Sequence, residues 1–343
     1  MATVLVSGGA GYIGTELVEQ LLDAGHKVTC LDRVFFGRDL LGTIAKHANF
    51  TLVREDLRTF DPAVLNGVDV VFDLAGISND PACDLDPHIT REINLDGCVR
   101  LATLAKAAGV KRYVFSSSCS VYGQGSDLAL TEDSALAPVS LYAECKIRAE
   151  EQLLALADAS FTVTILRNAT VYGPSRRMRY DLLVNLMTAK AFTDRVIYVL
   201  GGGQQWRPNV HVRDVARAFI HVMEQPEPKV RSRVFNVGSN EQNFRVVDVA
   251  HIVRDVMPHV SIQVVPDDPD RRTYNVNFDR IHSELGFRTL YSIPDSVAEL
   301  RHRMTTGTVL PFGEPRTKTL DYYAWLIKAR AVLDDVSLAG RLF

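Results

Sequence analysis

The chain has 343 residues, of which 47% are hydrophobic and 23% charged, and this composition is that of a folded globular protein and excludes intrinsic disorder. Lysine and arginine total 38 against 41 acidic residues, so the net charge of −3 gives no overall basic surface for nucleic acid or an anionic membrane. The longest uninterrupted apolar run, residues 322–327, is six residues long, whereas a helix that spans a bilayer needs about 20. We therefore expect no membrane segment and no nucleic-acid partner.

The N-terminal residues carry no basic segment before the first strand-like run, so we expect no cleaved signal peptide and a cytoplasmic protein. The five cysteines are odd in number, scattered and without CxxC spacing, which favours reduced thiols over disulfides or a zinc site. The histidines show no ligand spacing, and we expect no metal.

Short β-branched runs alternate with amphipathic helical stretches through the first half of the chain. They predict strands at residues 4–7, 27–32, 51–56, 68–74, 112–117 and 161–167. Strands and helices that alternate in this way form βαβ units, which build a parallel sheet covered on both faces. The predicted fold class is α/β, with a doubly wound parallel sheet.

After residue 173 this rhythm breaks. An arginine-rich loop, a helix near residues 181–188 and a glycine turn precede a helix at 212–224 and a strand at 234–237 that returns to the main sheet. A polar loop at 266–272 and a final helix at 319–333 follow. We expect a sheet domain of residues 1–172, joined by 212–240, and a smaller C-terminal lobe of residues 173–211 and 241–343.

A glycine-rich turn, Ser7-Gly-Gly-Ala-Gly-Tyr-Ile-Gly, lies directly after the first strand and opens an amphipathic helix. Glycines at these positions permit a tight turn and let the backbone approach a pyrophosphate, while the helix N-terminus offers unpaired N–H groups. This context predicts a Rossmann-type dinucleotide site. Its expected cofactor contacts are Gly8, Gly11, Tyr12, Ile13 and Gly14.

The cofactor type is indicated by the ends of the next strands. Asp32 ends the second strand, close to the spacing of about 20 residues at which a carboxylate binds the adenosine ribose hydroxyls, and this favours NAD. Arg33 beside it leaves some room for the 2′-phosphate of NADP. Asp56 and Leu57, at the end of the third strand, are expected to meet the adenine, although a strand-end acid without that role is the alternative.

Tyr142 and Lys146 carry the strongest catalytic signal. They stand at i and i+4 near the start of a helix over residues 141–157 and so share a face. A lysine ammonium nearby lowers the pKa of a tyrosine by favouring the phenolate, which allows the pair to move protons at neutral pH. A hydroxyl from the run 116–118 at a strand end would orient a substrate alcohol or carbonyl.

On these residues the chain resembles the extended short-chain dehydrogenases/reductases, the group that includes NAD-dependent nucleotide-sugar epimerases and dehydratases. Further matches lie at Leu74-Ala75-Gly76, at Asn94, and at residues 115–123, 166–174 and 205–212. The resemblance implies an NAD site that adds Leu74, Ala75, Gly76, Asn94, Ser116, Tyr142 and Lys146 to the residues above. It also implies that the smaller lobe binds substrate and that the protein is a homodimer, packed through the helix of Tyr142 and the one near residues 92–108.

The resemblance further assigns residues to catalysis and to substrate. It implies that Ser118 is the catalytic hydroxyl, that Arg207 binds the nucleotide diphosphate, and that Arg271 or Arg272 is a second such arginine. Asn168 and Thr170 stand at substrate positions but depart from the usual family pattern.

Other substrate contacts are expected from position alone. Ser78 and Asn79 follow the fourth strand at the sheet edge where ligands bind in open α/β sheets. Arg176, Arg177 and Arg179 form either an anion clamp, with Arg179 as the substrate contact, or a solvated loop face.

Cys119 marks the main departure from the family. The 4,6-dehydratases of the family follow the catalytic hydroxyl with Asp-Glu, whereas this chain has Cys119-Ser120. Enzymes that epimerise at C3 or C5 place a cysteine two residues before a tyrosine, and here Ser120 occupies that position before Tyr122. Cys119 is therefore a candidate acid/base, with a small apolar filler as the alternative.

These features predict NAD-dependent modification of a nucleoside-diphosphate sugar through a transient ketosugar, with epimerisation at C4 as the leading reaction. The alternatives are a ketosugar reductase or dehydrogenase with net redox change, and a dehydratase or C3/C5 epimerase that uses Cys119. A non-catalytic, NAD-sensing binding protein on the same scaffold is a hypothesis of a different class.

Overall fold

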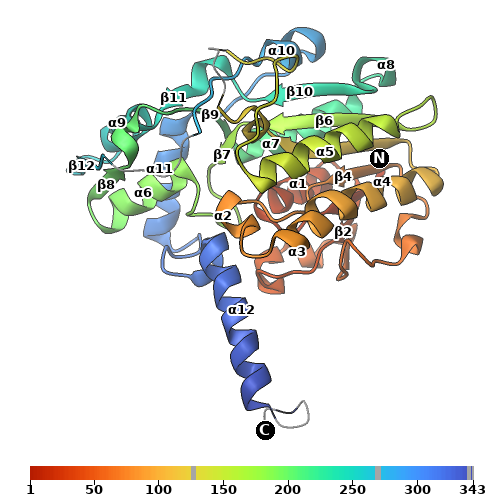
Figure 1. The fold of residues 1–343 in the computed structure, drawn as a ribbon, viewed down its shortest axis with the longest axis horizontal. Helices are drawn as coiled ribbons and strands as arrows, with labels where there is room; N and C mark the ends of the chain where they lie inside the picture. Colours follow the sequence, from red (N-terminus) through yellow and green to blue (C-terminus); the bar gives the residue numbers. More distant parts are fainter. Residues whose placement is uncertain (125–128, 267–271, 338–340, 342–343) are drawn as a thin grey trace.

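The computed structural model describes residues 1–124, 129–266, 272–337 and 341. Its centre is a sheet of seven parallel strands in the order β10-β6-β5-β4-β1-β2-β3 (Figure 1). The strands are β1 (Thr3–Ser7), β2 (Lys27–Leu31), β3 (Phe50–Val53), β4 (Val70–Asp73), β5 (Arg112–Ser118), β6 (Thr162–Asn168) and β10 (Arg233–Val237). The predicted doubly wound α/β fold is confirmed, and the strand predicted near residue 234 does return to the main sheet, beside β6.

Helices cover both faces of this sheet because successive strand residues point to opposite sides. In β1, Val4 and Val6 join the core under α1 (Tyr12–Asp23) and α7 (Val212–Glu224), while Leu5 joins the core under α4 (Cys98–Ala107) and α5 (Leu141–Ala155). Figure 1 shows α4 and α5 in front of the sheet and α1 behind it. The near-continuous apolar strands are thus buried on both faces, as parallel strands require.

The strand order reverses between β1 and β4, and this switch point is where a doubly wound sheet forms its binding crevice. The ends of the two strands are joined by a hydrogen bond of 2.5 Å from the Ser7 hydroxyl to the Asp73 carboxylate. The backbone N–H of Ala75, just beyond β4, donates to the same Ser7 oxygen at 3.1 Å. Ser7 therefore fixes the mouth of the crevice.

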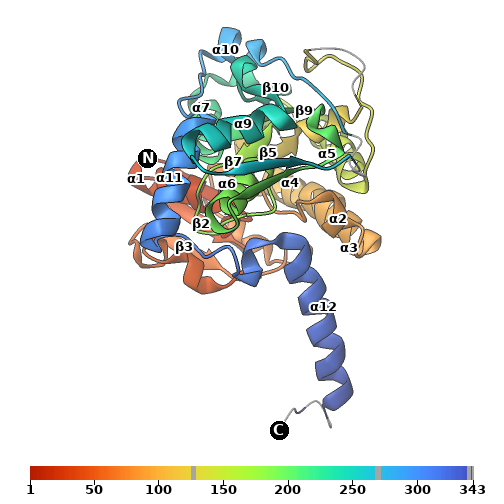
Figure 2. The same ribbon diagram turned by 90° about the vertical axis from the view of Figure 1, so that its left-hand side faces the viewer.

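After β6 the chain builds a second lobe around two small sheets. β7 (Thr170–Tyr172), β9 (Trp206–His211) and β11 (Asn243–Arg245) form one, and β8 (Val196–Val199) pairs with β12 (Ser261–Val264) in the other. Helices α6 (Leu183–Thr193), α9 (Val246–Val256) and α11 (Ile293–Thr306) pack around them and share a separate core (Figure 2). The sequence division places residues 170–172 in the sheet domain, but β7 pairs with β9 in this lobe.

Among the element boundaries that differ from the sequence prediction, two have a visible cause. β3 ends at Val53 instead of residue 56, because the Asp56 carboxylate accepts the backbone N–H of Arg58 at 2.9 Å and turns the chain. α6 begins at Leu183 instead of residue 181, because Asp181 binds Arg179 and the N–H of Tyr180 donates to Thr317. In both cases a side chain or a distant segment overrides the local pattern.

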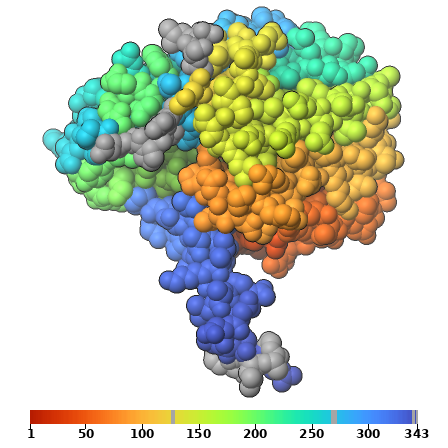
Figure 3. Space-filling model, viewed as in Figure 1, coloured from red at the N-terminus to blue at the C-terminus, as the bar shows by residue number. Residues whose placement is uncertain are grey.

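The remaining helices are short, except for the last one. They are α2 (Asp80–Cys83), α3 (Pro87–Arg91), a π-helical turn (Glu92–Gly97), α8 (Glu227–Val230) and α10 (Asp279–Leu285). The last helix, α12 (Thr319–Val336), begins against the body and then stands out from it into solvent (Figure 3). Among the described residues, no helix combines the length and the apolar character needed to cross a bilayer.

Candidate active site

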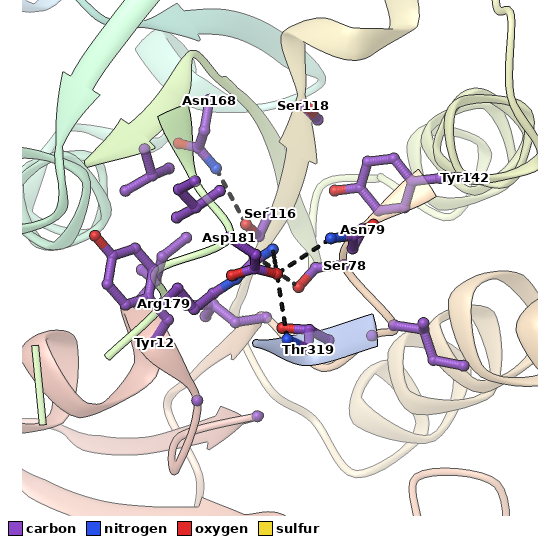
Figure 4. Close-up of a pocket in the computed structure, with 18 of the residues that line it drawn as sticks. Tyr12, Ser78, Asn79, Ser116, Ser118, Tyr142, Asn168, Arg179, Asp181 and Thr319 are labelled. Atoms are coloured by element: carbon purple, nitrogen blue, oxygen red, sulfur yellow. Dashed lines mark hydrogen bonds and ion pairs between the residues drawn. The ribbon is translucent and has the colours of Figure 1, made fainter. Parts of the chain in front are cut away.

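A cavity of about 610 Å³ lies at the carboxyl ends of the main-sheet strands, between the sheet and the second lobe (Figure 4). Almost all predicted cofactor and substrate residues line it: Gly8, Gly11, Tyr12, Ile13, Gly14, Asp32, Arg33, Asp56, Leu57, Leu74, Ala75, Gly76, Ser78, Asn79, Ser116, Ser118, Tyr142, Lys146, Asn168, Thr170, Arg179, Arg207 and Arg272. Asn94 and Cys119 are predicted site residues that do not line it. The other arginine candidate, Arg271, lies outside the described residues.

The glycine turn between β1 and α1 is packed too closely for any side chain. Gly8 has a φ of +68°, and a Cβ atom there would lie 2.8 Å from the backbone of Ala75. A Cβ atom on Gly14 would lie 2.2 Å from the carbonyl oxygen of Gly8. No side chain caps α1 at Gly11, so the N–H groups of its first turn remain available to a ligand. Such a turn offers backbone donors and a positive helix end to a phosphate.

Asp32 stands at the end of β2 with its carboxylate held by the backbone. The N–H groups of Ala10 and Val34 donate to its two oxygens at 3.0 and 2.6 Å. Partial burial raises the pKa of Asp32, and these two bonds oppose that shift. A carboxylate fixed in this way has acceptor positions left for the hydroxyls of a ribose.

Arg33, which leaves room for a 2′-phosphate in the sequence analysis, is engaged elsewhere. Its guanidinium forms an ion pair of 2.9 Å with Asp56 and lies 4.4 Å from the ring centroid of Phe35. Hydrogen bonds from Arg58 are the main cause that lowers the pKa of Asp56 to about 2. On this side of the cavity Arg33 is therefore already paired with Asp56. The Asp32 carboxylate is the group there that can accept hydrogen bonds from a ligand.

Ser118, Tyr142 and Lys146 converge on the cavity from β5 and α5. The Ser118 hydroxyl accepts the backbone N–H of Ser120 at 3.1 Å and forms a side-chain hydrogen bond with Tyr142. The Lys146 ammonium donates to the carbonyl oxygen of Ser116 at 2.7 Å and lies 5.8 Å from the Tyr142 ring centroid. The sequence motif thus forms one compact group, in which the lysine is anchored to the strand.

The electrostatics of Tyr142 differ from the sequence expectation. Burial raises the pKa of Tyr142 above its usual range, and the nearby Asp80 and Cys83 raise it further. Arg179 and the hydrogen bond with Ser118 lower it, but less. The expected lowering of this pKa is therefore not found in the protein alone, where burial dominates and the hydroxyl is the stable form.

Two of the buried residues that line the cavity, Asn168 and Ser120, carry a side-chain polar atom without a partner among the described residues. Asn168 donates to the hydroxyl of Ser116 and to the carbonyl of Ser117 at 3.1 Å each, and its carbonyl oxygen has no partner among the described residues. The hydroxyl of Ser120 is also buried and without a partner there. Because an unpaired buried polar atom is costly, both atoms point to a ligand that completes them.

Arginines line the opposite side. Arg179 binds Asp181 through two bonds of 3.1 and 3.0 Å and donates to Ser78 at 3.2 Å. Arg272 forms an ion pair with Asp80, and Arg207 donates to the carbonyl of Arg272. In Figure 4, Arg179 lies beside Asp181 and Ser78, from where its charge acts on Tyr142.

The sequence profile of the NAD dependent epimerase/dehydratase family matches residues 4–238. The chain belongs to this family. The predicted resemblance to NAD-dependent nucleotide-sugar enzymes is therefore confirmed, and NAD is the cofactor that the family uses. The glycine turn, the fixed Asp32 carboxylate and the unpaired atoms of the cavity fit that cofactor.

Similar proteins differ in the reaction that they are named for. The chain is 30% identical, over 74% of its length and 81% of the relative, to an uncharacterised UDP-glucose epimerase of Bacillus subtilis. It is 29% identical, over 81% and 86%, to a UDP-N-acetyl-alpha-D-glucosaminuronate decarboxylase of Bacillus cytotoxicus.

Two solved structures share the fold over nearly their whole length. TunA, an NAD dependent NDP-hexosamine 5,6-dehydratase, has 28% identity and a TM-score of 0.78, with 89% of this chain and 98% of TunA covered. MoeE5 in complex with UDP-glucose and NAD has 28% identity and a TM-score of 0.77, with 89% and 99% covered.

Asn94 is a residue for which the family resemblance implies a cofactor contact. Asn94 is fully buried, and its amide accepts the backbone N–H of Ile77 at 2.8 Å and donates to the Ile77 carbonyl at 2.9 Å. It holds the loop that presents Gly76 to the cavity, and it does not itself line the cavity. Its place in a π-helical turn aims the amide at this loop.

Cys119, a candidate acid/base in the sequence analysis with a small apolar filler as the alternative, does not line the cavity. It is 1% exposed, and its thiol donates to the carbonyl of Arg167 at 3.3 Å. Burial raises the pKa of this thiol well above its usual range, which opposes any role as a base. The neighbouring Ser120 lines the cavity instead.

Among the cavity residues that sequence did not identify as site residues are Arg177, Asp181, Thr319 and Tyr323. Arg177 appeared only in the arginine run. Asp181 anchors Arg179, and Thr319 and Tyr323 open the last helix, more than a hundred residues away along the chain. The Arg-x-Arg-x-Asp spacing at 177–181 is a local signal for the first two, whereas no local pattern marks the last two.

Proposed function

We propose that the protein is an NAD-dependent epimerase that inverts C4 of a nucleoside-diphosphate sugar through a transient 4-ketosugar. The observation that carries the proposal is the convergence of Ser118, Tyr142 and Lys146 in the cavity of the glycine turn. These are groups for oxidising and reducing an alcohol. The two positions after Ser118, where the family's dehydratases carry Asp-Glu, hold Cys119, which does not line the cavity, and Ser120, which does.

When bound, NAD supplies a hydride acceptor for the oxidation and a hydride donor for the return. In its tyrosinate form, Tyr142 takes the proton of the C4 hydroxyl while the hydride leaves C4, and Ser118 holds that oxygen through a hydrogen bond. Lys146, fixed on the carbonyl of Ser116, brings a positive charge that favours the tyrosinate as the proton moves. After the sugar turns over, Tyr142 returns the proton as hydride reaches the opposite face. The product is inverted at C4, with no net redox change.

For the substrate, we propose two groups of contacts. Arg207 and Arg272 bind the diphosphate, since guanidinium groups bind phosphate oxygens in pairs. Thr170, Asn168 and Ser120 line the same cavity and bind the sugar, which is supported by the unpaired buried atoms of the last two. Ser78 and Asn79 complete the site through the network of Arg179 and Asp181.

We also propose a division of labour along the chain. Residues 1–172 and 212–240 bind NAD, supported by the pairing of β10 with β6, and residues 173–211 and 241–343 bind substrate. A homodimer through α4 and α5 is proposed because these helices lie side by side on the outer face of the sheet. A cytoplasmic location is supported by the five cysteines, all free and buried.

The test is to incubate the purified protein with NAD and, separately, UDP-glucose, UDP-galactose, UDP-N-acetylglucosamine and UDP-glucuronic acid. Proton NMR of the products reports the configuration at C4, and absorbance reports reduced nicotinamide. We expect a C4-inverted product with no accumulation of reduced cofactor. Stoichiometric reduction of NAD would instead establish a dehydrogenase, and loss of water or carbon dioxide a dehydratase or decarboxylase. Tight NAD binding without turnover of any of the sugars would support the non-catalytic, NAD-sensing hypothesis.

A further inference from the structure

Arg177 is a buried cation without an acidic partner. It is 2% exposed and lines the cavity, and no carboxylate of the described residues forms an ion pair with it. One nitrogen donates to the hydroxyl of Thr319 at 2.9 Å, whereas Nε has no partner among the described residues. Burial and the charge of Arg179 lower the pKa of Arg177 to about 9. A buried guanidinium in this state is stabilised by an anion.

The chain before Arg177 is attached to the first turn of α1. The hydroxyl of Ser175 donates to the carbonyl of Tyr12 at 2.8 Å and lies 2.9 Å from the hydroxyl of Thr15. The Tyr12 hydroxyl in turn donates to the carbonyl of Gly173 at 2.6 Å. Arg177 therefore enters the cavity beside the glycine turn. Its guanidinium and the N-terminus of α1 are two positive features that can bind the same anion.

Arg177 also connects this place to the C-terminal segment of residues 315–323, which we call the strap. Its guanidinium carbon lies 3.6 Å from the ring centroid of Phe36, which packs against Tyr322 and Tyr323 with centroids 5.6 and 5.7 Å apart. Arg316 donates to the carbonyl of Phe36 at 3.0 Å. The strap is thus fastened to the loop that follows Asp32.

Further hydrogen bonds and an ion pair hold both ends of the strap. Arg316 forms an ion pair of 2.9 Å with Asp39, and the hydroxyl of Tyr322 donates to the carbonyl of Phe35 at 3.1 Å. The N–H of Thr319 donates to Asp181 at 3.3 Å, beside Arg179 (Figure 4). Thr319 and Tyr323 face the cavity from this strap.

We propose that Arg177 binds the pyrophosphate of NAD and that the strap closes the cofactor half of the cavity, so that NAD leaves only when the strap detaches from the loop of residues 34–39. The assignment rests on the NAD dependence of the family and not on the sugar or on the carbon that reacts. A pyrophosphate is the negatively charged partner that Arg177 does not have among the described residues, and a guanidinium binds phosphate oxygens in pairs. The strap suits an enzyme that keeps its cofactor through many turnovers.

The pyrophosphate assignment is tested by binding alone, with ADP-ribose and adenosine as probes. Arg177→Met is expected to weaken ADP-ribose binding about 10- to 100-fold, since charge-assisted hydrogen bonds are lost, and adenosine binding less than about 2-fold. The matched control is Arg176→Met, because Arg176 pairs with Glu19 and Thr43 outside the cavity. Equal loss of both probes, or unchanged ADP-ribose binding, overturns the assignment. If the methionine variant does not fold, Arg177→Gln is measured with the same two outcomes.

The strap is tested by the rate at which NAD leaves the loaded protein, followed by gel filtration after dilution. Arg316→Gln removes the bonds to Asp39 and Phe36 and is expected to speed release about 10-fold. Thr319→Val, which removes the acceptor that positions Arg177, is expected to speed it about 5-fold. Arg330→Gln is the control, because Arg330 bonds only to Asp334 on the outer part of α12. Release from Arg316→Gln at the wild-type rate overturns the strap. Neither experiment needs a sugar, so its failure is separate from failure of the proposed reaction.

Discussion

The ammonium group of Lys146 on α5 donates a hydrogen bond of 2.7 Å to the carbonyl oxygen of Ser116 on β5. The same ammonium lies 4.3 Å from the ring centroid of Phe115. The lysine thus has a fixed position between helix and strand, one turn of helix beyond Tyr142. Its effect on Tyr142 is that of a positioned charge rather than of a direct bond.

Lys146→Met is expected to lower kcat about 100-fold or more, because both the charge and the anchoring bond are lost. The protein should still fold, since the methionine fills most of the volume. The measurement is kcat with NAD in excess, beside thermal unfolding. Lys106→Met is the control, because Lys106 bonds to the carbonyl of Leu156 far from the cavity. A kcat within about 2-fold of wild type would remove Lys146 from the mechanism.

Tyr142→Phe removes one oxygen atom and should lower kcat about 1,000-fold while NAD remains bound, because the proton acceptor is lost but the ring is kept. The matched control is Tyr122→Phe. Tyr122 is buried, does not line the cavity, and donates to Asn236 at 2.8 Å. That variant should lose about 1 kcal/mol of stability and little activity. Full activity of Tyr142→Phe would contradict the proposed mechanism.

Asp32→Ala should weaken NAD binding about 10- to 100-fold, since bonds between a carboxylate and the ribose hydroxyls are each worth about 1.5–3 kcal/mol. Binding of NADP should fall far less, because its 2′-phosphate gains from the loss of a negative charge. The measurement is the ratio of the dissociation constants of NAD and NADP, by calorimetry. No separate control variant is needed, because both cofactors are measured on the same protein. An unchanged ratio would show that Asp32 does not contact the ribose.

The buried ion pair of Arg167 and Glu150, 2.7 Å long, ties β6 to α5 beneath the catalytic residues. Arg167→Met leaves the Glu150 carboxylate buried and unpaired, and this should cost about 3–5 kcal/mol in free energy of unfolding. Adding Glu150→Leu should recover most of that loss, because no charge is then buried. Urea unfolding measures the stability of both variants. Equal stability of the single and double variants would show that the unpaired Glu150 carboxylate is not the cause of the loss.

Glu16, on the buried face of α1, should make stability depend on pH. Burial raises the pKa of Glu16 to about 7, so folding favours its protonated form. Its stabilising contribution is complete below about pH 4.5 and is lost as pH rises through 7. Glu16→Gln should remove that dependence and be more stable than wild type at pH 8 by on the order of 2 kcal/mol.

The comparison is the difference in unfolding free energy between pH 5 and pH 8. Glu19→Gln is the control, because Glu19 is exposed on the same helix and pairs with Arg176. It should change that difference by less than about 0.5 kcal/mol. A pH difference in Glu16→Gln equal to that of wild type would show that another group is responsible.

Much of the cofactor site could be predicted because its signals are local. The glycine turn, Asp32 and the Tyr142–Lys146 pair each depend on a strand end or on one helix face. Cys119 could not be oriented, because it opens a tight 3₁₀ turn after β5 in which a shift of one residue separates the cavity from the core. The sequence offers both Cys119 and Ser120, and only packing selects the serine.

The contacts that sequence could not supply are those between distant segments. Asn94 reaches Ile77, and Thr319 reaches Arg177, through folding of the whole chain. Neither pair has a spacing that a motif could record. The pKa of Tyr142 likewise depends on burial and on charges from distant segments, such as Asp80 and Arg179.

The walls of the cavity come from opposite ends of the chain, with Gly8 on one side and Thr319 and Tyr323 on the other. Synthesis on the ribosome proceeds from the first of these to the last, so the complete sheet exists before the strap has been made. A nascent chain halted before residue 315 has its glycine turn but no closed pocket. The closure that we propose for the cofactor half of the cavity therefore waits until residues 315–323 have been made.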